Sequence, residues 1–231
     1  MRIVSLIPAR GGSKGINRKN LQKVGEISLL EIKILQSRAS DCNEIWVSTE
    51  DLEIASKSKQ NGANIIERPM ALAEDDTSTD DMLMHAAETL KLALCDCIIL
   101  LQPTSPLLRL SSVNKCIEML LENHELNSVI TLRKAHPFMW EEAEFMNWDP
   151  SGHTREVRPR RQELHPSGYE TGGCYAIRVQ SLYEQRVRYP KPTGIVSVNH
   201  LEAIDIDTLE DLSLANSIFG LLNSTEKYRI F

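Results

Sequence analysis

The residues best suited to chemistry gather near the start of the chain, between Ile7 and Asn20. This stretch holds one serine, three glycines and four cations, which are Ser13, Gly11, Gly12, Gly15, Arg10, Lys14, Arg18 and Lys19. Glycines let backbone N–H groups approach a ligand closely, and arginine and lysine add charge-assisted hydrogen bonds, so the composition suits a triphosphate. The spacing is neither that of a Walker A loop nor that of a G-x-G-x-x-G dinucleotide loop. A solvated basic turn is the alternative interpretation.

A pair of carboxylates, Asp205 and Asp207, forms a second candidate site. The segment Asp205-Ile206-Asp207 alternates like a strand, which would point both carboxylates to one face. Two adjacent carboxylates repel each other, and a divalent cation between them and a triphosphate would relieve that repulsion. We therefore expect a Mg²⁺ site here. The alternative is a pair of acidic residues at the end of a strand.

Two further polar segments follow or precede predicted elements. Gln102 comes directly after the apolar run Cys97–Leu101, which has the character of a buried parallel strand, and prolines constrain the loop beyond it. A polar side chain on a constrained loop can bind a substrate at little entropic cost. Residues 75–81 offer several N-cap residues before a helix that includes Met82, so a cap is their alternative role.

Strands alternate with helices along most of the chain, which predicts an α/β fold with a doubly wound, mostly parallel sheet. Strands are expected at 2–7, 45–47, 64–67, 97–101, 128–132 and 195–198, and helices at 29–35, 51–61, 111–122 and 209–219. Ligands in such sheets bind beyond the carboxyl ends of the strands, where the basic loop would lie. From Lys134 to about Glu170 the periodicity fades into an aromatic and arginine-rich segment, and a loop this long is usually functional or covered by a partner.

Composition bounds the class of protein. The 231 residues are 42% hydrophobic and 25% charged, which is enough for one sizeable core. A net charge of -6 argues against general nucleic-acid binding, although a local basic pocket could still take a nucleotide. No apolar run approaches the roughly 20 residues of a membrane span, and Met1 leads directly into a predicted strand, so we expect a cytoplasmic protein. The five cysteines and six histidines lack C-x-x-C and zinc-type spacing.

Four motifs in order resemble the acylneuraminate cytidylyltransferase (CMP-sialic acid synthetase) family. The first is the run from Pro8 to Gly15, Pro-Ala-Arg-Gly-Gly-Ser-Lys-Gly, which is followed by Lys-Asn-Leu at 19–21. The others are Arg68-Pro69 with Leu72-Ala73 and 75–79, then 101–107, and then Asp205-Ile206-Asp207-Thr208. Their separations are similar to those of the family, so the resemblance spans nearly the whole chain.

The resemblance implies a Rossmann-like nucleotidyltransferase made of a single domain, 1–231. Residues 134–170 would form a protruding insertion that contributes to dimerisation and to the substrate pocket, and the protein would be a homodimer.

The resemblance also assigns the site residues. Nucleotide-binding residues would be Ala9, Arg10, Gly11, Gly12, Ser13, Lys14, Lys19, Asn20, Arg68, Ser78 and Thr79, of which the last three would contact the cytidine. Substrate-binding residues would be Gln102, Arg161, Thr171, Gly172 and Tyr175. The residues carrying catalysis would be Arg10, Lys14, Lys19 and Asp207, with Mg²⁺ on Asp205 and Asp207.

The implied reaction joins CTP to a sialic-acid-like, nine-carbon 2-keto sugar acid and releases pyrophosphate. The match to the family is imperfect: Thr171 replaces a common asparagine, Tyr169 an arginine found in some members, and Met139 lies near a position often occupied by lysine. Such changes alter which acid is bound. Legionaminic, pseudaminic and 3-deoxy-octulosonic acids are therefore alternative acceptors, and a non-catalytic nucleotide-sensing module is an alternative function.

Overall fold

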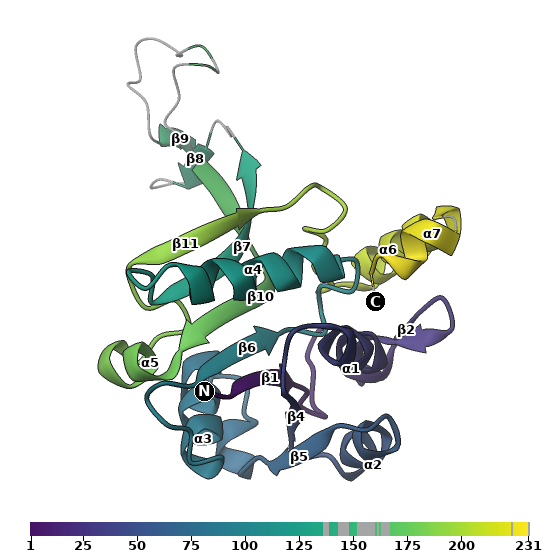
Figure 1. The fold of residues 1–231 in the computed structure, drawn as a ribbon. Helices are drawn as coiled ribbons and strands as arrows, with labels where there is room; N and C mark the ends of the chain where they lie inside the picture. Colours follow the sequence, from purple (N-terminus) through teal and green to yellow (C-terminus); the bar gives the residue numbers. More distant parts are fainter. Residues whose placement is uncertain are drawn as a thin grey trace.

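The centre of the molecule is a seven-stranded sheet in the order β11-β7-β10-β6-β1-β4-β5 (Figure 1). The computed structural model describes residues 1–135, 139–142, 148–151, 160, 162, 167–222 and 224–230. The sheet strands are β1 (Ile3–Pro8), β4 (Glu44–Thr49), β5 (Asn64–Glu67), β6 (Cys97–Leu101), β7 (Ser128–Ala135), β10 (Ser167–Arg178) and β11 (Thr193–Ser197). Neighbouring pairs are parallel except those of β10, which runs antiparallel to β6 and β7. The predicted doubly wound, mostly parallel sheet is confirmed.

Helices cover both faces of this sheet, which is why the central strand β6 is apolar along its whole length. The helices are α1 (Leu29–Ala39), α2 (Leu52–Gln60), α3 (Thr79–Thr89), α4 (Leu110–Glu122), α5 (Val179–Gln185), α6 (Leu209–Leu221) and α7 (Ser224–Tyr228). One buried cluster joins the sheet to α1, α2 and α4, and a second joins it to α3 and α5. Every residue of β6 is buried, as expected of a strand covered on both faces.

Side-chain caps begin several helices, and one of them lies within the predicted cap segment at 75–81. Ser28 and Thr208 form capping boxes with Glu31 and Asp211 at the starts of α1 and α6. Ser78 caps α3 by accepting a hydrogen bond from the Asp81 backbone N–H. These caps hold the first turns of the helices next to the loops that precede them.

A third apolar cluster holds the C-terminal helix against the start of the chain. Phe219 of α6 packs against the small hairpin of β2 (Lys23–Val24) and β3 (Ile27–Ser28) and against α1. Gly25 has φ +63° and lies against the Phe219 ring, where a side chain would collide. This packing brings the residues before α6, including Asp207, to the loop after β1.

The segment expected to lack regular structure contains strands in its described parts. β7 continues to Ala135, β8 (Met139–Glu142) pairs antiparallel with β9 (Trp148–Ser151), and β10 begins at Ser167. Figure 1 shows β8 and β9 projecting away from the main sheet, beyond the ends of β7 and β10. Whether this segment mediates dimerisation stays a prediction.

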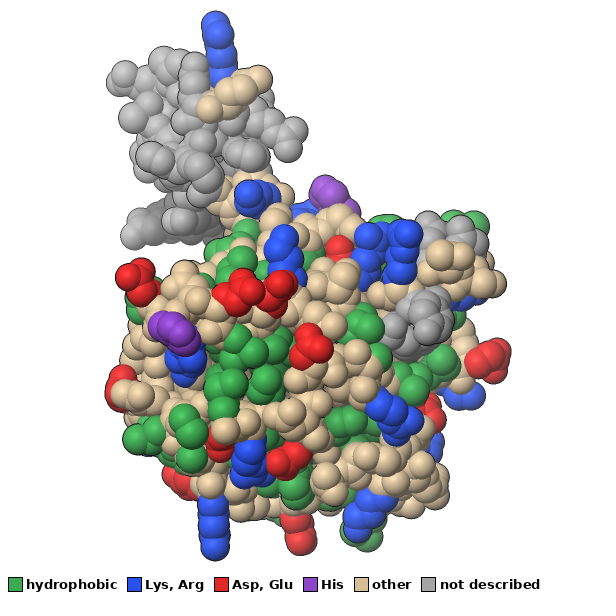
Figure 2. Space-filling view, in the orientation of Figure 1, with side chains coloured by type: hydrophobic (Ala, Val, Ile, Leu, Met, Phe, Trp, Pro, Cys, Tyr) green, Lys and Arg blue, Asp and Glu red, His purple; other side chains and the backbone are tan. Residues whose placement is uncertain are grey.

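The charged side chains of the face in Figure 2 are mixed, with basic and acidic groups interspersed among apolar ones. Within the ranges that the structure describes, no helix is long and apolar enough to cross a membrane.

Candidate active site

A cavity of about 270 Å³ opens at the carboxyl edge of β1 and β6. Its walls come from the loop after β1, from the segment between β5 and α3, and from the loop after β6. The lining residues are Pro8, Arg10, Gly12, Ser13, Lys19, Asn20, Arg68, Leu72, Glu74, Asp75, Thr77, Ser78, Thr79, Met82, Gln102, Pro103 and Thr104. A neighbouring hollow adds Lys14. The structure thus brings together most residues that the sequence predicts for nucleotide binding.

Backbone contacts fix the basic loop in place. The Ala9 N–H donates to the Ser48 carbonyl at 3.0 Å, and the buried Asn20 amide donates to the Arg10 carbonyl at 2.8 Å. The Gly11 N–H donates to a Glu50 carboxylate oxygen at 2.6 Å. Ala9 and Gly11 do not line the cavity, so in this structure they shape the loop, while Arg10, Gly12 and Ser13 face the ligand space.

Two of the loop cations converge on one carboxylate. Arg10 pairs with Asp75 at 2.8 Å, and Lys14 pairs with its other oxygen at 3.1 Å. Arg10 also donates to the carbonyls of Ala73 and Glu74. The hydrogen bond from Lys14 is the main cause that lowers the pKa of Asp75. Asp75 therefore occupies the position at which Arg10 and Lys14 would bind an anionic ligand. The sequence does not predict this role of Asp75.

The third cation, Lys19, links the loop to the acidic pair. Its Nζ donates to the Ile206 carbonyl and to Asp207 Oδ1, both at 2.9 Å. Gly15 lies against the Asp207 backbone, so a side chain at position 15 would collide with it. Asp205 and Asp207 do not themselves line the cavity, but their segment contacts Lys19 and Thr104, which do.

The acidic pair does not lie on a strand, which corrects the sequence-based expectation. Residues 204–207 are irregular, because the Ile206 N–H bonds the Thr104 carbonyl at 2.8 Å instead of a neighbouring strand. Asp205 lies near Ser105, whose Oγ is 3.3 Å from Asp205 Oδ1. Burial raises the pKa of Asp205, and the charge of Asp207 raises it further. The two carboxylates are therefore close enough to repel each other.

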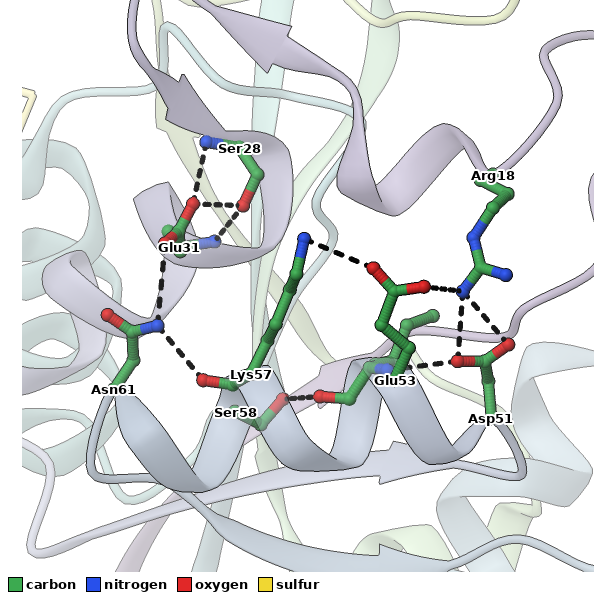
Figure 3. Close-up of polar contacts among 9 residues, drawn as sticks. Arg18, Ser28, Glu31, Asp51, Glu53, Lys57, Ser58 and Asn61 are labelled. Carbon is green, nitrogen blue, oxygen red and sulfur yellow. Dashed lines mark hydrogen bonds and ion pairs between the residues drawn. The ribbon is translucent and has the colours of Figure 1, made fainter.

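The fourth cation of the loop points elsewhere. Arg18 pairs with Asp51 and Glu53 at the start of α2, each at 3.1 Å, as Figure 3 shows. It does not line the cavity. The composition of the loop does not show that Arg18 has a structural role and Arg10 lines the cavity. That difference depends on where α2 begins, because Arg18 pairs with residues at its start.

Another cavity-lining residue, Arg68, is buried and held by Ser48. Its Nε donates to Ser48 Oγ at 3.1 Å, and its terminal nitrogen donates to the Ser48 carbonyl at 2.8 Å. Burial lowers the pKa of Arg68 to about 10. Ser78 and Thr79 also line the cavity, although the Ser78 hydroxyl is engaged in the α3 cap through Asp81.

Of the predicted substrate residues, Gln102 lines the cavity, whereas Thr171 and Tyr175 are buried away from it. Gln102 lines the cavity and lies beside Gly172, where φ is +69° and a Cβ would come within 2.9 Å of Gln102 Oε1. Thr171 is buried, with its hydroxyl 2.8 Å from that of Thr131. Tyr175 is buried on the α3 side of the sheet and donates to Glu170. Arg161 lies outside the described residues.

Several cavity residues were not predicted from the sequence. They are Pro8, Leu72, Glu74, Asp75, Thr77, Met82, Pro103 and Thr104. All lie within or beside the motifs at 8–15, 68–79 and 101–107, so their position next to a motif was the available signal.

A basic, glycine-rich loop at the carboxyl edge of a mostly parallel sheet, bordered by paired carboxylates, is an arrangement of nucleotide-binding α/β proteins. The sequence model of the family described as "Cytidylyltransferase" matches residues 4–218, and the chain belongs to this family.

Curated relatives carry the resemblance further. The chain is 31% identical over 175 residues to "N-acylneuraminate cytidylyltransferase B" of Danio rerio, covering 74% of this chain and 40% of that protein. It is 29% identical over 238 residues to "CMP-N,N'-diacetyllegionaminic acid synthase" of Legionella pneumophila, covering 96% of this chain and 97% of that protein. The chain thus spans 40% of that Danio rerio relative, 50% of a second one, "N-acylneuraminate cytidylyltransferase A", and nearly all of the Legionella one.

Solved structures support the fold. A CMP:2-keto-3-deoxy-manno-octonic acid synthetase complexed with CTP superposes with a TM-score of 0.71 at 18% identity, covering 95% of this chain and 99% of that one. A 4-diphosphocytidyl-2C-methyl-D-erythritol synthase from Anaerococcus prevotii superposes with a TM-score of 0.64, also at 18% identity, covering 95% and 98%. At this identity the likeness establishes the fold alone.

Proposed function

We propose that this protein transfers CMP from CTP to the anomeric hydroxyl of a sialic-acid-like 2-keto sugar acid and releases pyrophosphate. The observation that carries the proposal is that Arg10, Lys14 and Lys19 gather at one cavity and its neighbouring hollow, that Lys19 pairs with Asp207, and that the buried Arg68 also lines the cavity. Family membership supports the nucleotide, and the names of the relatives support the class of acid.

The chemistry needs positioning and charge neutralisation. The anomeric oxygen forms a bond to the α-phosphorus and its proton passes to water, while the bond from that phosphorus to the bridging oxygen breaks, so the β- and γ-phosphates depart as pyrophosphate. Arg10 and Lys14 would bind phosphate oxygens after releasing Asp75, and Lys19 would approach them from the acidic pair. Cations placed around the transferring group stabilise the charge that develops on it. Neither this reaction nor the site calls for a side-chain nucleophile.

Asp205 and Asp207 suit a divalent cation. They repel each other, as the raised pKa of Asp205 reflects, and a cation between them would relieve the repulsion. Mg²⁺ usually takes only one or two protein carboxylates and completes its shell with water and substrate phosphates. When bound, the metal would neutralise charge on the triphosphate. The described residues contain no cluster of three or more acidic, histidine or cysteine ligands, which is consistent with a two-carboxylate site.

On the acceptor side, Gln102 beside Gly172 would fix a hydroxyl or acyl group, and Arg161 would pair with the carboxylate of the acid. The exposed Tyr169, which stands where some members of the family that the sequence resembles would have an arginine, favours an acid with an apolar edge, such as a deoxy or diacylated nonulosonic acid.

The assembly we propose is a two-fold homodimer joined through residues 134–170. Sedimentation as a monomer at micromolar concentration would contradict it.

The decisive test of the function is a turnover screen. CTP, ATP, GTP and UTP would each be incubated with Mg²⁺ and with N-acetylneuraminic, N,N'-diacetyllegionaminic, pseudaminic or 3-deoxy-octulosonic acid, and pyrophosphate release would be measured. We expect CTP to be used at least about 100-fold better than the other nucleotides, because a site built to hydrogen-bond one base leaves polar groups unpaired with another. Comparable rates with all four nucleotides would refute the cytidine assignment. CTP binding without turnover on any acid would indicate a nucleotide sensor instead.

A further inference from the structure

A lysine is buried beneath the acceptor side of the site. Lys33 lies on α1 between Ile32 and Ile34, and its side chain is fully shielded from solvent. Its Nζ donates to the Ser105 carbonyl and to Gln36 Oε1, both at 2.7 Å. Both of these acceptors are uncharged oxygens. Among the described residues, no carboxylate forms an ion pair with the ammonium group.

Stability alone does not account for a lysine at this position. Taking an ammonium group out of water is costly, and an apolar side chain of similar volume would avoid that cost. Burial lowers the pKa of Lys33 to about 7, with Cys174 and Asp205 acting in the opposite direction. Nζ can donate hydrogen bonds whether it is neutral or charged. The role of Lys33 is therefore indicated by the Ser105 carbonyl to which it donates.

That carbonyl belongs to the turn that builds the acceptor wall. Ser105 lies in the loop after β6, and its backbone N–H donates to the Gln102 carbonyl at 3.3 Å. Its hydroxyl lies 3.2 Å from the Thr171 carbonyl and 3.3 Å from Asp205 Oδ1. Ser105 therefore touches the segments that place Gln102, Gly172 and the acidic pair.

The neighbouring glutamine holds the far end of the same turn. Gln36 is fully buried, and its amide nitrogen donates to the Leu108 carbonyl and, at 2.6 Å, to the Ile230 carbonyl. Lys33 and Gln36, one turn apart on α1, thus hold the loop by hydrogen bonds to the carbonyls of Ser105 and Leu108. Two anchors three residues apart leave the turn little freedom to shift.

We propose that Lys33 is a positioning residue for the acceptor: by holding the Ser105 carbonyl it sets the turn that presents Gln102 beside Gly172. This inference rests on the proposed function. Lys33 itself touches no substrate, and it acts through the turn. A displacement of about 1 Å in such a wall can cost up to about 100-fold in rate, because reacting groups must meet in a narrow geometry.

The test is Lys33→Met, which keeps most of the side-chain volume and removes the donor. Steady-state kinetics would be measured with CTP and with whichever of N-acetylneuraminic and N,N'-diacetyllegionaminic acid the wild type uses faster. We expect the KM for the acid to rise about tenfold and kcat to fall, the loss of one well-placed hydrogen bond being worth about that factor. The KM for CTP should change less than about twofold, because Arg10, Lys14 and Arg68 are held by other segments.

The control is Ser37→Ala. Ser37 is equally buried on the same helix, but its hydroxyl contacts Ser5 and the Lys33 carbonyl, away from the turn. We expect its kinetics to match the wild type. If Lys33→Met does not fold, Gln36→Met tests the same grip at Leu108 and should also raise the KM for the acid selectively.

The outcomes separate the inference from the function on which it rests. Unchanged kinetics in a folded Lys33→Met protein would overturn the positioning role while leaving the proposed function intact. Equal losses for both substrates, or equal losses in Ser37→Ala, would also overturn it, because they indicate a general packing defect. A wild type that turns over none of the acids would refute the proposed function, and this inference with it.

Discussion

Replacing Asp207 by asparagine is expected to lower cytidylyl transfer at least about 100-fold, which corresponds to about 2.7 kcal/mol of lost transition-state stabilisation. A neutral amide is a poor ligand for a hard cation, so the acidic pair would lose half of its charge toward the metal. The Mg²⁺ concentration needed for half-maximal rate should rise as well. The expected change in unfolding temperature is small, because the Asp207 side chain is 74% exposed and its pair with Lys19 is a surface ion pair.

The matched control for this substitution is Glu210→Gln. Glu210 is an exposed carboxylate in the first turn of α6, three residues beyond Asp207, and does not touch the basic loop in the described structure. Removing its charge should leave both the rate and the Mg²⁺ dependence near those of the wild type. If Asp207→Asn retained its rate within about threefold, the metal would have to be bound elsewhere.

The parts of the fold that depend on local sequence could be predicted. The strand before the basic loop and the helices begun by Ser28, Ser78 and Thr208 all carry their signals within a few residues. The position of the loop also follows from general rules, because the loops after parallel strands meet at one edge of a sheet.

The parts that the sequence did not predict depend on distant contacts. β10 was missed because Gly172, with φ +69°, interrupts its alternation, and the ladder with β7 shifts register between Glu170 and Tyr175. The prediction of a strand at 205–207 was wrong, because the Ile206 N–H donates to the Thr104 carbonyl and not to a neighbouring strand. The buried state of Lys33 depends on a carbonyl 72 residues away, and no local pattern encodes that contact.

Within the basic loop the structure separates two arginines that look alike in sequence, and Arg10→Ala should separate them functionally. We expect this substitution to raise the KM for CTP by about 10- to 100-fold, since a hydrogen bond to a charged phosphate contributes about 1.5–3 kcal/mol. The guanidinium lines both the main cavity and the neighbouring hollow, and the carbonyls of Ala73 and Glu74 hold it there. KM and kcat for CTP would be measured at saturating acid.

Arg18→Ala is the control, because it removes the same side chain from the same loop. The two arginines are similarly exposed, at 31% for the Arg10 side chain and 39% for that of Arg18, and each forms ion pairs. Arg18 contacts Asp51 and Glu53 at the start of α2, so its loss should affect stability slightly and the KM for CTP by less than about twofold. If both substitutions raised the KM for CTP to the same extent, the triphosphate would be held by the net charge of the loop. If only Arg10→Ala did so, the direction of the side chain, set by the segment at 73–75, would decide which cation binds phosphate.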